Sequence, residues 1–129
     1  MDDPSIRASL WKAMPYIDYF LCNGKEAARM VDENNPQRAA STLKARGAAN
    51  VIIKLGKKGC LVEGDSASEV IPAPKVDVLD TTGAGDAFAA GLIAALTRGA
   101  DIQNACQAGN QAGAHVATRL GPIQAWIDK

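Results

Sequence analysis

One stretch of this 129-residue chain combines residue types that could bind and transfer a phosphate, the run DTTGAGDAFAAG from Asp80 to Gly91. It joins a turn of small residues to an apolar helix. The first backbone N–H groups of a helix have no partner inside it, and the helix dipole adds about half a positive charge there. Phosphate is a natural ligand of such an end. Gly83 and Gly85 let the chain bend and let a ligand approach the amides. The sequence therefore predicts an anion site.

Asp86 would lie in the first turn of that helix, beside the predicted anion. An ionised carboxylate only accepts hydrogen bonds, so its place next to a phosphate needs a chemical reason. Phosphoryl transfer to a hydroxyl group provides one. The amides would stabilise charge on the transferring group while Asp86 orients the alcohol and accepts its proton. The alternative is ordinary capping, because Asp and Gly are common before helices.

Two other phosphate-binding motifs do not fit the same residues. A Walker loop needs a Lys followed by Ser or Thr after its second glycine, and no such Lys follows Gly85. A dinucleotide fingerprint needs a third glycine where this chain has Phe88. Neither motif explains a carboxylate at the site, since the dinucleotide motif keeps its acidic residue about 20 residues away, at the ribose.

The run resembles the second signature of the ribokinase-like carbohydrate kinases, also called the PfkB family, which reads D-T-x-G-A-G-D-x-F. The resemblance implies that Gly83, Ala84 and Gly85 form the anion hole and that Asp86 is the catalytic base. It implies transfer of a phosphoryl group from ATP, with Mg²⁺, to a hydroxyl of a sugar or related small alcohol. The similarity extends over residues 3–121.

Two further motifs concern cations. Asn23-Gly24-Lys25-Glu26 is similar to the family's N-x-x-E motif, which implies that Asn23 and Glu26 lie near the magnesium ion and the phosphates. Magnesium retains several waters, so one Glu could hold the hydrated ion through water. The alternative is that Asn23 caps a helix and Glu26 complements its dipole. The carbonyls around Asp80 and Thr82 resemble the loop that binds a potassium-like ion in some members.

Three residues are expected to line the nucleotide. Lys54-Leu55-Gly56-Lys57-Lys58-Gly59 is similar to the family's T-L-G-x-x-G segment, and Gly56 matches. Lys54 replaces the usual Thr, so a hydroxyl contact does not carry over, although an ammonium group could take its place. Asn110 matches the position where a family Asn approaches the adenine. The alternative for Asn110 is a polar residue on a helix surface.

Composition narrows the function classes. Fourteen basic and fourteen acidic residues cancel, and no basic cluster indicates nucleic acid or an anionic membrane as a partner. The three cysteines lack the spacing of a zinc or redox site, so we expect reduced and mostly buried thiols. No apolar run approaches the roughly 20 residues of a membrane span, and the N-terminus has no signal-peptide character. These features predict a cytoplasmic protein with one domain over residues 1–129.

The hydrophobic pattern alternates helices with short apolar strands, which is typical of an α/β protein with a mostly parallel sheet. A β-hairpin is expected around Gly56–Gly59. We expect the first helix to carry Ile6, Leu10, Trp11 and Met14 on one face, and the small residues after the signature to let their helix approach the sheet closely. Helices are predicted from Pro4 to Pro15, from Asn23 to Val31, from Pro36 to Gly47, after the signature, and from Asp101 to Leu120; strands are predicted over residues 17–22, 51–55, 60–62 and 69–71.

The resemblance implies a three-layer α/β/α, Rossmann-like fold of which this chain is the C-terminal, nucleotide-binding portion. Complete members are much longer, and nothing here corresponds to their N-terminal half, with its central strands, sugar site and β lid. An exposed sheet edge where those strands belong predicts self-association, as a homo-oligomer or an aggregate. Because the acceptor site is absent, a noncatalytic nucleotide-binding or partner-binding module is the alternative function.

Overall fold

The computed structural model of this protein describes residues 3–64, 68–76 and 83–118. The chain divides into two compact units. The first comprises Met1–Leu55 and Cys60–Val70, and the second comprises Gly56–Gly59 and Ile71–Lys129. The expectation that residues 1–129 form one domain stays a prediction. Among the described helices, none is long and apolar enough to cross a membrane.

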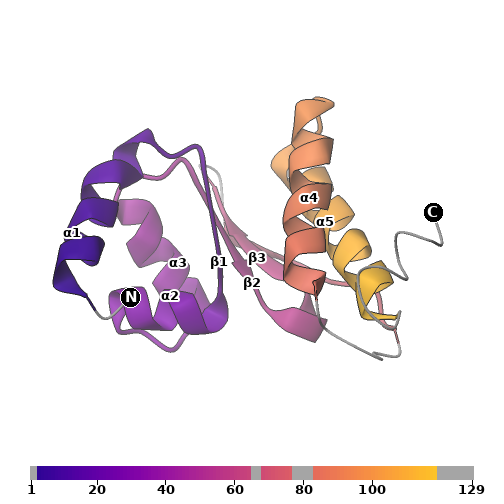
Figure 1. Cartoon of the computed structure of the whole chain (residues 1–129), viewed down its shortest axis with the longest axis horizontal. Coiled ribbons are helices and arrows are strands. Elements are labelled where there is room, and N and C mark those ends of the chain that lie inside the picture. The colour runs from indigo at the N-terminus through magenta and orange to yellow at the C-terminus, as the bar shows by residue number, and fades with distance from the viewer. Residues whose placement is uncertain (1–2, 65–67, 77–82, 119–129) are drawn as a thin grey trace. The chain divides into compact units, whose positions relative to one another are not determined.

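The first unit is a sheet with three α-helices, in the order α1, β1, α2, α3, β2, β3 and β4 (Figure 1). The strand order in the sheet is β1-β2-β3-β4. β1 and β2 are parallel, whereas β2 and β3 form the expected antiparallel hairpin, so the described sheet is mixed. The α/β class predicted from the sequence is confirmed. The elements are α1 Pro4–Ala13, β1 Tyr19–Asn23, α2 Gly24–Val31, α3 Pro36–Ala45, β2 Asn50–Lys54, β3 Cys60–Glu63 and β4 Ser68–Ile71, whose last residue belongs to the second unit.

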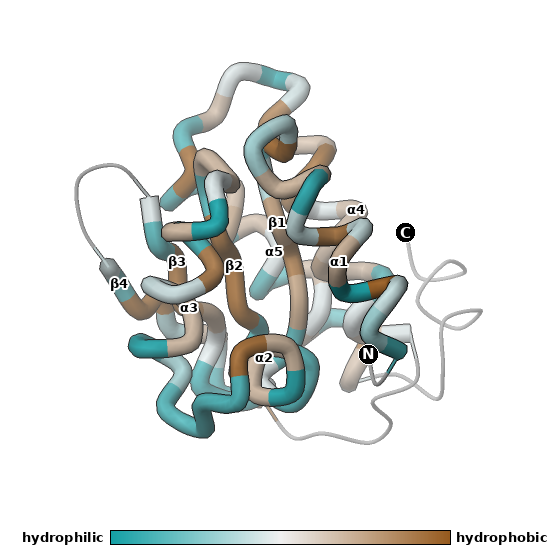
Figure 2. Tube along the Cα trace, turned by 90° about the vertical axis from the view of Figure 1, so that its left-hand side faces the viewer, coloured by the Kyte–Doolittle hydropathy of each residue, from teal (hydrophilic) through white to brown (hydrophobic). Residues whose placement is uncertain are grey.

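The core of the first unit lies between one face of the sheet and helices α1–α3 (Figure 1). β2 and β3 are apolar along most of their length (Figure 2), as expected for strands buried on both faces. Val51 and Ile53 point into this core, and Ile52 between them is fully buried on the opposite face. The buried residues of the cluster are Met14, Cys22, Ala27, Met30, Ala39, Ala40, Leu43, Ala48, Val51, Ile53 and Leu61.

Helix α1 reaches this core only at its C-terminal end. Met14, just beyond the helix, is fully buried, and Leu10 and Trp11 pack against the core, but Ile6 is 56% exposed. The expectation that Ile6 joins the core face is therefore wrong, because the first turn of α1 extends past the core. The guanidinium of Arg46 lies 4.3 Å from the centre of the Trp11 ring, which ties α1 to the end of α3.

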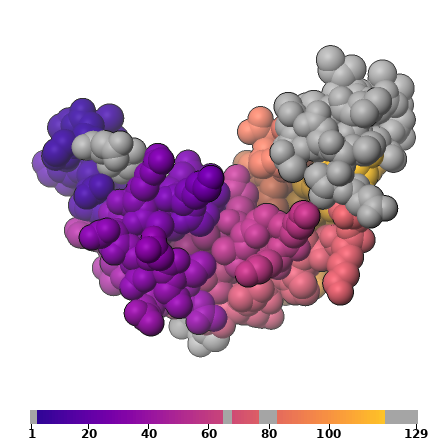
Figure 3. Space-filling model, turned by 90° about the horizontal axis from the view of Figure 1, so that it is seen from below, coloured from indigo at the N-terminus to yellow at the C-terminus, as the bar shows by residue number. Residues whose placement is uncertain are grey.

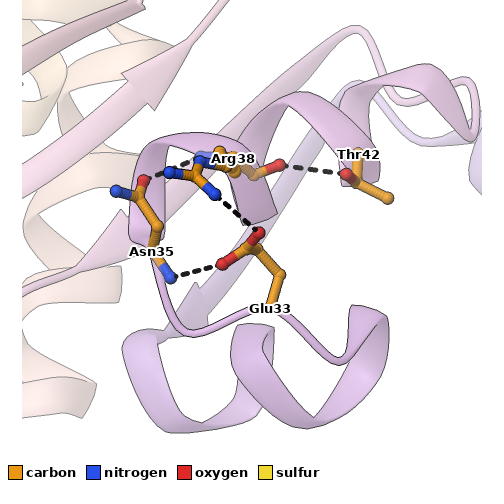
Figure 4. Close-up of polar contacts among 4 residues, drawn as sticks. All are labelled: Glu33, Asn35, Arg38 and Thr42. Atoms are coloured by element: carbon orange, nitrogen blue, oxygen red, sulfur yellow. Dashed lines mark hydrogen bonds and ion pairs between the residues drawn. The ribbon is translucent and has the colours of Figure 1, made fainter.

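The α2–α3 connection is held by local polar contacts (Figure 4). Asn35 caps α3, its Oδ1 accepting from the Arg38 amide at 3.1 Å, and the Asn35 amide donates to Glu33 at 2.8 Å. Glu33 also pairs with the Arg38 guanidinium at 3.7 Å, and the Thr42 hydroxyl donates to the Arg38 carbonyl. Helices α2 and α3 form much of the face seen in Figure 3. An open polar hollow of about 730 Å³ lies here and contains none of the predicted site residues.

The second unit contains two helices that pack side by side, α4 over Ala84–Thr97 and α5 over Ile102–Ala117 (Figure 1). Phe88, Leu92 and Ala95 of α4 are buried, and Leu96 is half-buried. A Cβ atom on Gly91 would lie 2.8 Å from the Ala108 carbonyl oxygen. The small residues of α4 thus serve a close approach to α5, since backbone contacts backbone there. The predicted end of the last helix at residue 120 lies outside the described residues.

Candidate active site

Gly83 is the N-cap residue of α4, and it adopts the left-handed conformation with φ 81°. The Ala87 amide donates to the Gly83 carbonyl at 2.9 Å, which is the first hydrogen bond of the helix. The amides of Ala84, Gly85 and Asp86 precede this bond, so they have no carbonyl partner within the helix. This end of α4 therefore presents backbone donors and the positive end of a helix dipole.

This helix start differs from those of the other described α-helices. Each of the four begins at an Asp or Asn whose side chain accepts a hydrogen bond from an amide of its first turn; these caps are Asp3, Asn23, Asn35 and Asp101. Gly83 has no side chain and cannot cap in this way. Gly83 is nevertheless the N-cap residue of α4, so the alternative of ordinary capping by Gly stays open.

Asp86 is exposed in the first turn of α4, beside these amides. Its position is fixed by Phe88, whose buried ring packs against α5. A Cβ on Gly109 would lie 3.0 Å from the ring and from the carbonyl oxygen of Phe88, and a Cβ on Gly113 would lie 3.2 Å from the Ala84 carbonyl oxygen. Two glycines of α5 therefore hold the first turns of α4 at close range.

Asn23 and Glu26 form a reciprocal capping box at the start of α2. The Asn23 side chain accepts from the Glu26 amide at 2.8 Å, and Glu26 Oε1 accepts from the Asn23 amide at 2.9 Å. The capping alternative is thus observed, and it leaves the exposed Glu26 side chain within reach of a hydrated ion. Within the described residues, no group of three or more His, Cys, Asp or Glu side chains could hold a metal directly.

The parallel pairing of β1 and β2 brings Lys54 opposite Asn23, at the carboxyl ends of both strands. Ligands of open α/β sheets bind at such ends. Cys22, which precedes Asn23 in β1 and pairs with Ile53, is buried. The pKa of the Cys22 thiol is raised to about 12. Desolvation is the main cause, the charge of Glu26 raises the pKa as well, and the charge of Lys54 lowers it. Sequence reasoning did not single out Cys22, although its place just before Asn23 at a strand end was the available signal.

The raised pKa of Cys22 predicts a loss of stability at alkaline pH. The unfolded chain releases the thiol proton near pH 9, whereas the folded chain keeps it up to about pH 12. The free energy of unfolding should therefore fall between pH 9 and 12, by at most about 1.4 kcal/mol per pH unit from this group, and should not change through it below pH 9. Urea unfolding of the wild type and of Cys22→Ala over this range isolates the contribution. Parallel pH curves for the two proteins would contradict the prediction.

The predicted nucleotide residues of the second unit have different environments. Gly56 is exposed in the tight turn that leads to β3, with φ 65°. Asn110 is only 5% exposed, so the alternative of a surface residue is wrong. Its Nδ2 donates to the Ile71 carbonyl at 3.0 Å and to the Pro72 carbonyl at 3.4 Å. The contact of Asn110 with a nucleotide stays a prediction.

The structure thus groups the predicted residues in two sets. The first unit brings together Asn23, Glu26 and Lys54 at the strand ends, and the second holds Gly56, Asn110 and the start of α4. Asp80 and Thr82, predicted to bind a monovalent cation, lie outside the described residues. The three cysteines are buried, as expected.

Comparisons with known proteins show the family and the fold of this chain. The family model for pfkB family carbohydrate kinases matches residues 1–129. Fructokinase of Vibrio alginolyticus is 34% identical, and the match covers 96% of this chain and 42% of that enzyme. Aminoimidazole riboside kinase of Salmonella enterica, solved with aminoimidazole riboside and an ATP analog, superposes with a TM-score of 0.87 at 29% identity, over 97% of this chain and 44% of its own.

A second solved structure, a putative ribokinase II of E. coli in complex with ATP and Mg²⁺, has a TM-score of 0.81 at 29% identity, over 95% of this chain and 40% of its own. This chain thus spans about two fifths of the length of the relatives it matches. The ribokinase-like fold predicted from the signature is confirmed. By its family match and by its fold, the chain belongs to the pfkB family of carbohydrate kinases.

Proposed function

We propose that this chain carries the nucleotide-binding and catalytic-base portion of a kinase that transfers a phosphoryl group from ATP to a hydroxyl of a sugar or related small alcohol. The observation that carries the proposal is the start of α4, where amides without a carbonyl partner in the helix follow the side-chain-free Gly83, and Asp86 stands exposed beside them. Family membership over residues 1–129 supports it. On this proposal, residues 1–129 form part of a single ribokinase-like domain.

In the proposed reaction, Asp86 accepts the proton of the attacking hydroxyl and orients its oxygen toward the γ-phosphorus. The P–O bond to ADP breaks as the new P–O bond forms. The amides of Gly83, Ala84 and Gly85 donate to the oxygens of the transferring group, on which negative charge is spread. The N–H dipoles point toward the transferring group before the reaction begins, because α4 is anchored on α5. Little reorganisation is therefore needed during the reaction.

Mg²⁺ bound with ATP would neutralise charge on the phosphates. Its proposed protein partners are Glu26, through water, and Asn23, whose capping box fixes the side chain of Glu26 at the strand end. Lys54 lies opposite Asn23 in the sheet and would place an ammonium group near the same phosphates. Gly56 and Asn110 would shape the nucleotide site. A potassium-like ion at Asp80 and Thr82 is proposed from the resemblance alone.

The direct test uses the complete gene product that contains these residues. Binding of MgATP is measured by calorimetry, and ADP formation is followed with a panel of acceptors: ribose, fructose, other sugars, sugar phosphates and nucleosides. We expect saturable MgATP binding and turnover with at least one acceptor. Binding without turnover on any acceptor would support a noncatalytic nucleotide-binding module instead, and absence of MgATP binding would contradict both functions.

Glu26→Gln tests the magnesium proposal with little disturbance of the fold. Gln also fits the last position of a capping box, so the hydrogen bond to the Asn23 amide is retained and only the charge is removed. We expect the Mg²⁺ concentration for half-maximal activity to rise several-fold while the melting temperature stays unchanged. The measurement is a Mg²⁺ titration of turnover at fixed ATP. An unchanged Mg²⁺ requirement would remove Glu26 from the site.

Two proposals concern the surroundings of the protein. β1 is an end strand of the described sheet, and its Phe20 and Leu21 are half-buried, so we propose that this edge pairs with another strand or with a second copy of the chain. Sedimentation velocity measures the association. We also propose that the protein lies in the cytoplasm, because its three buried cysteines form no disulfide.

A further inference from the structure

Asn110 is the one polar residue counted as buried in the described part of the chain. A buried amide costs free energy unless its hydrogen-bonding groups find partners. Nδ2 of Asn110 donates to two successive carbonyls, those of Ile71 at 3.0 Å and Pro72 at 3.4 Å, across 39 residues of sequence. The amide therefore ties the middle of α5 to the segment that leaves β4.

That segment in turn supports the tight turn Gly56–Gly59. Gly59 is buried with φ 100°, and its Cα lies so close to the segment that a Cβ would overlap the Ile71 carbonyl oxygen and lie 2.7 Å from the Ala73 amide nitrogen. The carbonyl of Ile71 thus lies between two groups, the amide of Asn110 and the backbone of Gly59. All of these residues belong to the second unit.

We infer that Asn110 is a positioning residue of the proposed nucleotide site, which holds residues 71–73 against Gly59 and thereby fixes the shape of the Gly56–Gly59 turn. The inference rests on the proposed function, in which this turn lines the nucleotide. It assigns the donor atoms of Asn110 to backbone carbonyls and not to the adenine base. The effect of Asn110 on a nucleotide therefore passes through the backbone and does not depend on the identity of the base.

The first test examines the complete gene product without ligand. Asn110→Ala should accelerate hydrogen exchange in peptides that cover residues 56–60 and 71–76, because the Ile71 and Pro72 carbonyls lose their donor. The matched control is Gln111→Ala, which truncates the exposed neighbour on the same helix and should leave exchange unchanged. Unchanged exchange in Asn110→Ala would overturn the inference, since a residue that only contacts a nucleotide has no effect on the free protein.

The second test compares two nucleotides, ATP and ITP, which differ at the 6-position of the base. We expect Asn110→Ala to weaken the affinity for both nucleotides by about tenfold, which is the effect of leaving a buried carbonyl unpaired. The ratio of the two affinities should stay unchanged. A loss confined to ATP would show a direct base contact and would overturn the inference. If the wild type binds neither nucleotide, the proposed function fails, whereas an Asn110→Ala protein that binds both as tightly as the wild type refutes only the inference.

The third test uses Asn110→Asp, whose carboxyl group is a donor only when protonated. The ionised group would face the Ile71 and Pro72 carbonyl oxygens, which favours its neutral form. At pH 8 this variant should bind ATP as weakly as Asn110→Ala, and its affinity should recover toward the wild-type value as the pH is lowered to 5. The affinity is taken relative to Asn110→Ala at each pH, which cancels pH effects that the two variants share. A ratio that does not change with pH would overturn the inference.

Discussion

Asp86→Asn is expected to reduce turnover of the complete gene product by about 10²- to 10⁴-fold, the usual contribution of a general base. Asparagine keeps the shape of the side chain but cannot accept the proton of the attacking hydroxyl. Affinity for MgATP should stay equal or increase, because a negative charge near the phosphates is removed. Steady-state kinetics give the turnover, and calorimetry gives the affinity. Asp86 is exposed, so the folded structure should not suffer from the change.

The matched control is Asp101→Asn, at the start of the other helix of the second unit. Asp101 accepts from the Asn104 amide at 2.8 Å, and asparagine caps helices equally well, so neither stability nor turnover should change. Full activity in Asp86→Asn would remove Asp86 as the base. A large loss of MgATP binding in that variant would assign Asp86 to nucleotide binding instead.

Gly59→Ala is expected to cause a loss of stability of about 2 to 5 kcal/mol, the sum of two costs. An L-residue at φ 100° is strained by about 1–2 kcal/mol, and overpacking against backbone costs about 1–3 kcal/mol more. The clashing atoms are the Ile71 carbonyl and the Ala73 amide, which cannot rotate away as a side chain could. Since whole domains are stable by only 5–15 kcal/mol, much of the protein would unfold at modest urea concentrations.

Gly56→Ala separates the two costs within the same turn. Gly56 also has a positive φ, of 65°, but a Cβ there would meet nothing within 4 Å. The free energy of unfolding of Gly56→Ala should therefore fall only by the conformational cost, about 1–2 kcal/mol. Urea denaturation of both variants gives the difference. Equal losses for the two variants would show that the contact between Gly59 and residues 71–73 is not tight in solution.

Much of the fold could be predicted from local sequence signals. Asp3 and Pro4 predict the start of α1, and Asn23 with Glu26 predicts the start of α2, because caps depend on residues within one turn. The β-branched run at β2 predicts a buried strand, and the glycine-bounded turn after it predicts the hairpin. The start of α4 at the glycines of the signature is also local in origin.

The errors came from residues whose burial depends on distant parts of the chain. Ile6 has the spacing of a core residue, but α1 extends beyond the core and leaves it exposed. Asn110 was open to interpretation as a surface residue, yet it is buried and bonded to carbonyls 39 residues away. Gly91 meets the α5 backbone at Ala108, a contact that no local signal indicates, and the close approach of this helix to the sheet stays a prediction.

The sequence by itself determined the family of this protein and the start of α4, because the residues from Gly83 to Asp86 lie within a single helical turn. Only the tertiary structure decided what holds that turn and the neighbouring glycine turn in place. Phe88 is fixed by Gly109, and the Ile71 carbonyl lies between Asn110 and Gly59. The physical reason is that caps and backbone dihedrals are set by neighbours in sequence, whereas burial and close backbone approach are set by segments that meet only in the folded chain.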